Sequence, residues 1–124
     1  MFEREKLIER YFESWIKDDV STLEEVFDNS IIYSECYGPE YRGLKQVKQW
    51  FEDWHKKGNV LLWNIKSFAH DKNVTAVEWV FKCEYNNEIS MFDGVSLIIF
   101  NSNGKIVNLK EFESKAEHNF PYGE

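Results

Sequence analysis

The second half of the chain is built from four long strand-forming segments joined by very short turns. The segments cover residues 60–69, 74–85, 88–100 and 105–115 and are rich in β-branched and aromatic side chains. Asn and Gly, which suit tight turns, fill the links at 86–87 and 101–104. Links this short join neighbouring antiparallel strands, because a parallel connection needs a dozen or more residues. The pattern predicts an antiparallel meander.

Helical patterns precede this meander. Apolar side chains recur at helical spacing over residues 3–17, in a short segment that opens at Ser21, and over residues 44–57. A first strand is predicted at 31–36, between the second and third helices. Because helices come first and strands follow, the order predicts an α+β fold with three N-terminal helices packed on a curved antiparallel sheet.

Length and charge limit the classes of partner. The 124 residues suit one domain over 1–124, and the net charge of -7 repels phosphate, so neither nucleic acid nor a membrane surface is an expected partner. The first residues are charged and no apolar run approaches the ~20 residues of a membrane span, so we expect a cytoplasmic protein without a signal peptide. Cys36 and Cys83 are expected to be free thiols.

Two strands indicate which faces are buried. Alternation over 74–85 predicts an inward face made of Val77, Trp79, Phe81, Cys83 and Tyr85. Residues 95–100 are apolar on both faces, which a strand with one solvated face should not be. Either a second subunit or the C-terminal tail covers the outer face, and we expect a sheet-to-sheet homodimer.

The last strand carries acidic residues in register with apolar ones. Val107 and Leu109 share a face with Glu111 and Glu113, whereas Ile106 lies on the other face. If Leu109 points inward, Glu111 points inward too, and a buried carboxylate is expected to be protonated, hydrogen-bonded or functional. The alternative is a twist or bulge near Glu111 that places both acids at a solvated rim.

These features together resemble the nuclear transport factor 2-like superfamily, most closely its SnoaL-like branch. The residues that carry the resemblance are Tyr41-Arg42-Gly43 before the third helix, Asp93-Gly94 within the strand over 88–100, and the segment 100–107 at the last hairpin. The resemblance covers residues 7–115 and implies a cystatin-like cone around an apolar pocket. This fold hosts isomerases, cyclases, dehydratases, epoxide hydrolases and non-catalytic modules, so it implies no single activity.

The resemblance can be followed residue by residue. Steroid isomerases of this superfamily use a Tyr on the first helix, an Asp base on the first strand and a protonated Asp on a later strand. These positions fall on Tyr11, Ser34 and Ser96, with Glu35 next to Ser34, so two of the three depart from the pattern. Epoxide hydrolases of the fold use an interior Asp-Arg-Asp set, and the only arginines here are Arg4, Arg10 and Arg42.

The candidate site follows from these residues. In an enzyme, Glu111 would be a general acid or base, Tyr11 would donate a hydrogen bond to a developing oxyanion, and Asp93 is a second candidate acid, unless Asp93-Gly94 marks a bulge. The expected ligand is a small apolar molecule, and the candidate ligand-binding residues are Trp63, Trp79, Phe81, Ser96, Trp54 and Glu113. No metal-ligand spacing and no cofactor motif is found, so neither is expected. The alternative is a non-catalytic homodimeric module whose cone is filled by its own aromatic side chains.

Overall fold

The computed structural model describes residues 2–114 and 117–124. Its elements in chain order are α1 (Phe2–Lys17), α2 (Thr22–Val26), β1 (Phe27–Ser34), β2 (Glu40–Arg42), α3 (Leu44–His55), β3 (Gly58–Asp71), β4 (Val74–Tyr85), β5 (Glu88–Phe100) and β6 (Ile106–Ser114). The predicted α+β order is confirmed. Lys115, the predicted end of the last strand, lies outside the described residues. None of the described helices has the length and apolar character needed to cross a bilayer.

The six strands form one sheet in the order β2-β1-β6-β5-β4-β3. The predicted meander is confirmed, since β3, β4, β5 and β6 pair as antiparallel neighbours. The prediction of a wholly antiparallel sheet is wrong at one pair, because β1 runs parallel to β6. The connection between these two strands contains α3 and the rest of the meander, which is long enough to allow a parallel return.

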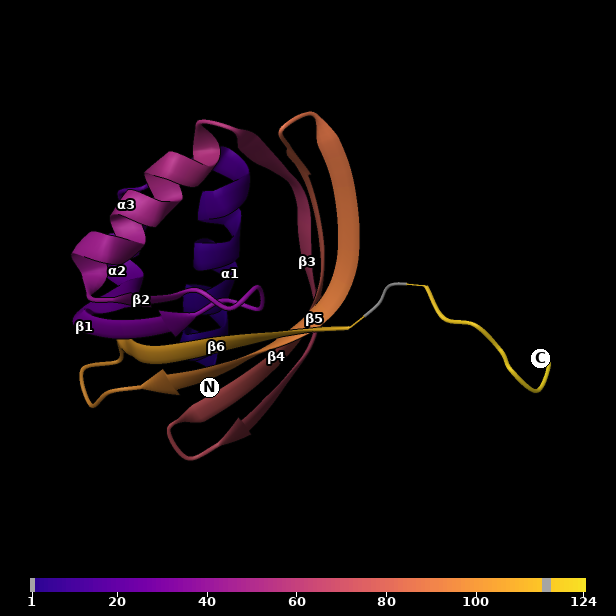
Figure 1. Ribbon diagram of the computed structural model, residues 1–124. Helices are drawn as coiled ribbons and strands as arrows, with labels where there is room; N and C mark the ends of the chain where they lie inside the picture. The colour runs from indigo at the N-terminus through magenta and orange to yellow at the C-terminus, as the bar shows by residue number, and fades with distance from the viewer. Residues whose placement is uncertain (1, 115–116) are drawn as a thin grey trace.

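The sheet curls around α1, and the helices lie together on its concave side (Figure 1). Two bulges in β3 contribute to this bend. Pairing with β4 shifts between Val60 and Leu62 and again between Ile65 and Ser67, which leaves one unpaired residue at each place. A bulge bends its strand and increases the local twist. The curvature creates the space in which the pocket lies.

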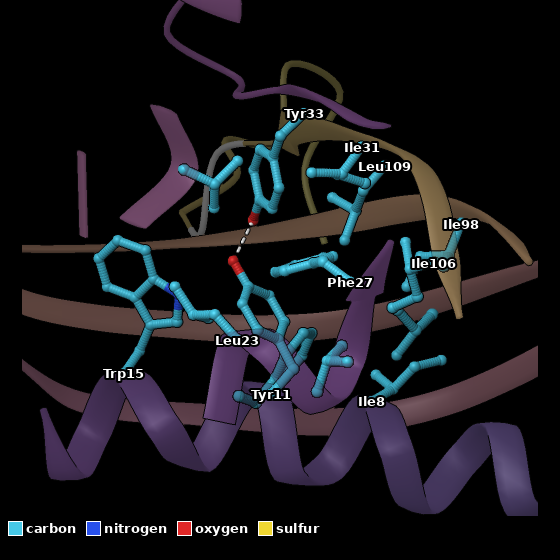
Figure 2. Close-up of a cluster of buried hydrophobic side chains, with 14 of the residues drawn as sticks. Ile8, Tyr11, Trp15, Leu23, Phe27, Ile31, Tyr33, Ile98, Ile106 and Leu109 are labelled. Atoms are coloured by element: carbon cyan, nitrogen blue, oxygen red, sulfur yellow. Dashed lines mark hydrogen bonds between the residues drawn. The ribbon is translucent and has the colours of Figure 1, made fainter. Parts of the chain in front are cut away.

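The concave side holds the core. Ile8, Tyr11, Phe12 and Trp15 of α1 are buried, so the predicted apolar face of this helix is confirmed. They meet side chains from β1, β5 and β6, among them Ile31, Ile98 and Leu109, in the cluster drawn in Figure 2. Each large apolar side chain of this kind contributes about 1.5–3 kcal/mol by leaving water.

The alternation of β6 breaks at Val107. Phe100 pairs with Ile106 but Ile99 pairs with Asn108, so Val107 has no partner across the ladder. The bulge brings both Ile106 and Leu109 fully into the core. The prediction that Ile106 lies on the outer face is therefore wrong, while Leu109 and Glu111 keep the inward direction.

The sequence suggests a bulge at Asp93-Gly94, but the structure has none there. Both neighbouring ladders pass through Gly94 without a shift, since it pairs with Trp79 on β4 and Glu113 on β6. A Cβ at this position would lie 2.3 Å from a ring carbon of Trp79 and 2.5 Å from the carbonyl oxygen of Phe112. The glycine therefore makes room for the Trp79 ring, which forms part of the pocket wall.

Candidate functional site

A pocket lies between the helices and the concave face of the sheet. Thirteen residues line it: nine are aromatic, two are cysteines and two are glutamates. All five tryptophans of the chain are among the nine. The space open to the centres of water-sized molecules is about 60 Å³. Since one water needs roughly 10–15 Å³ on this measure, the pocket holds several such molecules.

The aromatic walls are fixed by packing against one another. Trp63 stacks on Phe12 with ring centroids 3.8 Å apart, and it meets Trp79 edge to face at 5.7 Å and Phe81 at 5.3 Å. Such edge-to-face and stacked pairs are favourable arrangements of aromatic quadrupoles. Trp54, Trp63, Trp79 and Phe81, which the sequence nominates as ligand-binding residues, all line the pocket.

Glu111 of β6 is in the pocket, directly across the ladder from Ser96. The Tyr33 hydroxyl donates a hydrogen bond of 2.5 Å to its Oε2 atom. Burial raises the pKa of Glu111 to about 7, although the hydrogen bonds from Tyr33 and from the Cys36 backbone N–H act in the opposite direction. The negative charge of Glu35 adds to the rise.

Glu35 is the second carboxylate of the pocket, and the sequence did not nominate it. β1 ends at Ser34, and the Glu35 N–H then bonds to the carbonyl oxygen of Pro39 in the turn that follows. Strand alternation therefore does not govern Glu35, whereas Ser34 points to Glu40. Burial raises the pKa of Glu35 to about 7, against a hydrogen bond from the Tyr41 hydroxyl. The sequence does contain one signal for Glu35: it directly follows Ser34, the position predicted for the base.

Tyr11 lies behind the pocket wall. Its hydroxyl donates to the Tyr33 hydroxyl at 2.7 Å, and Figure 2 shows the two phenol groups pointing toward one another. Tyr11 is fully buried and is not among the residues that line the pocket. Burial raises the pKa of both tyrosines well above the usual value. The three side chains thus form a chain of donors that ends on the Glu111 carboxylate.

The remaining nominated residues lie outside the pocket lining. Ser96 is buried and accepts a hydrogen bond of 2.9 Å from the Trp79 indole N–H, so it holds a wall residue in place. Asp93 forms a 3.1 Å ion pair with Lys66. Glu113 is exposed and lies in a shallow neighbouring hollow. Of the three acids nominated from the sequence, the structure therefore brings Glu111 together with the aromatic residues and leaves Asp93 and Glu113 outside the lining.

The sequence matches the SnoaL-like domain family over residues 8–109, which is most of the chain. The chain belongs to this family. Its fold is that of the nuclear transport factor 2-like superfamily, as the sequence indicated. Among curated proteins, none matches this member of the family in sequence.

Solved structures with the same fold are distant in sequence. A Mycobacterium tuberculosis epoxide hydrolase aligns with a TM-score of 0.81 at 11% identity, over 92% of this chain and 84% of that one. A hypothetical protein with a ketosteroid isomerase-like fold from Catenulispora acidiphila, in complex with trimethylamine, gives a TM-score of 0.78 at 14% identity, over 87% of this chain and 85% of that one. A proposed SnoaL-like polyketide cyclase from Mesorhizobium loti gives 0.70 at 18%, over 86% and 96%.

The pocket of this SnoaL-like protein has its own set of polar groups. No arginine is among its lining residues, and Arg10 and Arg42 are exposed and paired with Glu25 and Glu40. The Asp-Arg-Asp set of epoxide hydrolases is therefore not reproduced among the lining residues. Cys36 and Cys83 line the pocket as free thiols, as predicted, and burial raises the pKa of Cys36 to about 12. Across the described residues, no three His, Cys, Asp or Glu side chains gather to hold a metal ion.

Two carboxylates with raised pKa values are what this site offers chemically. Burial raises both pKa values to about 7, and the charge of Glu35 adds to the rise at Glu111, so each carboxyl is present in protonated and ionised forms near neutral pH. An acid and a base then face the same small apolar space.

Trp63, which is 6% exposed, also carries an indole N–H with no acceptor among the described residues.

Proposed function

We propose that this protein binds a small, mostly apolar molecule in its aromatic pocket and moves protons to or from it with Glu111 and Glu35. The observation that carries this proposal is the pair of carboxyl groups with pKa values of about 7 inside one aromatic pocket. General acids and bases work best when their pKa lies near the working pH. Proton transfer next to a carbonyl, or ring closure or dehydration built on it, is the reaction class.

The hydrogen bonds divide the roles between the two acids. The Glu111 carboxylate accepts hydrogen bonds from the Tyr33 hydroxyl and the Cys36 N–H, and both donors favour its ionised form. Glu35 receives one donor, from Tyr41. Glu111 is therefore the base that takes a proton from carbon, and protonated Glu35 is the acid that donates to the oxygen of the developing enolate. Tyr11 acts through Tyr33, which it holds in position.

The size of the pocket supports a ligand of few atoms. The space open to the centres of water-sized molecules is about 60 Å³, which suits a compact molecule better than a steroid or a polyketide. The related Catenulispora protein was solved with trimethylamine, a molecule of this size class. We infer that the natural ligand here is similarly small.

Deuterium exchange into acetone tests the proposed chemistry without knowledge of the natural substrate. Proton NMR in heavy water would follow loss of the methyl signal in the presence of wild-type protein, the Glu111→Gln variant and the Glu78→Gln variant, whose altered residue is exposed on β4. We expect exchange above the buffer rate with wild type and Glu78→Gln, and a loss of about a hundredfold in the enhancement with Glu111→Gln. Exchange at the buffer rate with wild type would contradict acid–base catalysis.

A non-catalytic homodimeric module is the second candidate. Its support is the outer face of the sheet, where Leu97 is 39% and Phe112 52% exposed, and the filling of most of the cone by aromatic rings. On this proposal two copies pack sheet to sheet, and the pocket serves binding alone. Dimer formation is compatible with the first candidate as well, whereas absence of proton transfer favours the second.

A further inference from the structure

We infer that the pocket selects small organic cations of the alkylammonium type, held by the aromatic rings and by Glu35 and Glu111. This inference concerns the pocket of the proposed function and specifies its ligand class. It rests on the charge balance of the lining, the arrangement of the rings and an acidic hollow beside the pocket.

The lining contains acids without a base. Glu35 and Glu111 are its only ionisable groups that carry charge near neutral pH, because no Lys, Arg or His is among the thirteen lining residues. Removing a carboxylate from water without a counter-charge costs several kcal/mol. A ligand that brings a positive charge offsets this cost for both groups, whereas a neutral or anionic ligand does not.

The rings provide the second attraction. Aromatic faces carry negative quadrupole density, and Trp is the strongest partner for a cation. Trp79 and Phe81 line the pocket together with Trp63 and stand at 89° and 81° to it, so the rings of the wall differ in orientation. An ammonium ion with methyl groups can contact several such faces at once, while its apolar surface remains compatible with the rings. Walls made of several aromatic rings are used by proteins to recognise alkylated ammonium groups.

A hollow beside the pocket is also acidic. The pocket shares Glu35, Tyr37 and Trp54 with an adjoining groove that adds Asp53 and Glu88. Lys56, which is paired with Asp53 at 3.3 Å, and Lys57 balance these two charges in the groove. A further hollow beside Tyr37 adds Glu113 and Glu117. With a net charge of -7, the protein as a whole attracts cations.

Binding of a cation should be coupled to the ionisation of the acids. The titratable groups around the pocket are Tyr33, Glu35, Cys36, Tyr37, Cys83 and Glu111, with Tyr41 against Glu35. Burial keeps Cys36 and the tyrosines protonated near neutral pH, so the carboxyls are the groups that change. A cation is held more tightly once both are ionised, and affinity for it therefore rises as pH passes through the two pKa values of about 7.

A matched pair of probes tests this inference. Tetramethylammonium and tert-butanol have the same branching and the same number of non-hydrogen atoms, and they differ in charge. Their dissociation constants can be measured by tryptophan fluorescence, since all five tryptophans line the pocket. The samples are wild type, Glu35→Gln, Glu111→Gln, the double variant and Glu78→Gln as control, each verified as folded by circular dichroism.

We expect wild type and Glu78→Gln to bind tetramethylammonium at least about tenfold more tightly than tert-butanol, increasingly so as pH rises. Each glutamine substitution should weaken binding of the cation alone, and the double variant should lose the preference. Equal affinity for both probes, a preference for tert-butanol, or no binding of either would overturn the inference. Acetone exchange in a protein without preference for cations would overturn this inference and leave the proposed chemistry standing. Selective cation binding without acetone exchange would support this inference and contradict the proposed chemistry.

Discussion

The Tyr33 hydroxyl donates to the Glu111 carboxylate at 2.5 Å and itself accepts a hydrogen bond from Tyr11. A tyrosine on the exposed face of β1 would not be held between two such hydrogen-bond partners. The contact links the core of the cone to the acid that faces the pocket, so loss of the Tyr33 hydroxyl should be felt directly at Glu111.

Replacing Tyr33 with Phe should raise the pKa of Glu111 further above about 7. The hydroxyl favours the ionised carboxylate, and the variant loses this effect. It also leaves the buried Tyr11 hydroxyl without its acceptor, which costs about 1–3 kcal/mol of unfolding free energy. Carbon NMR titration of labelled glutamates and urea unfolding would measure the two effects. Tyr11→Phe is the matched control, because it leaves the Tyr33–Glu111 contact in place. An equal pKa change in both variants would contradict a direct effect of Tyr33.

The stability of the protein should fall as pH rises from about 4.5 to 7. Glu111 has a raised pKa in the folded protein, so the folded state binds more protons than the unfolded chain across this range. Its contribution is complete below the unfolded pKa and is lost as pH passes the folded pKa. The shift corresponds to about 3 kcal/mol at most. Glu111→Gln should flatten the curve and stabilise the protein at pH 8. A steeper dependence in the variant, measured by urea unfolding, would oppose this.

Replacing Gly94 with Ala should distort the pocket wall. The added Cβ would collide with the Trp79 ring and the Phe112 carbonyl, and overpacking of this kind costs about 1–3 kcal/mol. Near-ultraviolet circular dichroism should change along with the melting temperature. Adding Trp79→Phe removes the ring carbons nearest the new methyl, so the double variant should recover part of the loss. Simple addition of the two single effects would show that Gly94 and Trp79 are not coupled.

The outer face of the sheet should mediate a homodimer. Leu97 and Phe112 are exposed there, and the described C-terminal residues 117–124 are exposed too, so they do not cover it. Leu97→Lys should shift the protein to a monomer in native mass spectra, whereas Ile16→Lys on α1, also at an exposed apolar residue, should not. A monomeric wild-type protein would show that the two-sided apolar pattern of β5 has another cause.

The sequence predicts the helices, the meander and the inward face of β4 because these follow from local periodicity and short turns. Nothing local marks the bulges of β3 or the bulge at Val107, which depend on how two strands pair. The parallel pairing of β1 with β6 joins segments that are far apart in the chain, and short-link arguments do not reach it.

The candidate site was predicted in part. Glu111, Trp63, Trp79 and Phe81 follow from strand alternation, which the bulges of β3 and β6 leave intact at these positions, and they do line the pocket. Glu35 does not follow, because it lies just after the end of β1, where the turn sets its direction. Tyr11 was correctly placed on the buried face of α1, but its partner Tyr33 could be identified only in three dimensions.

The most direct test of the central claim is a carbon NMR titration of the glutamate side-chain carboxyls in the wild-type protein. We expect two signals to titrate near pH 7, one absent in Glu35→Gln and the other in Glu111→Gln. Titration of every glutamate near its ordinary value of about 4.3 would contradict the existence of an acid–base pair in this pocket.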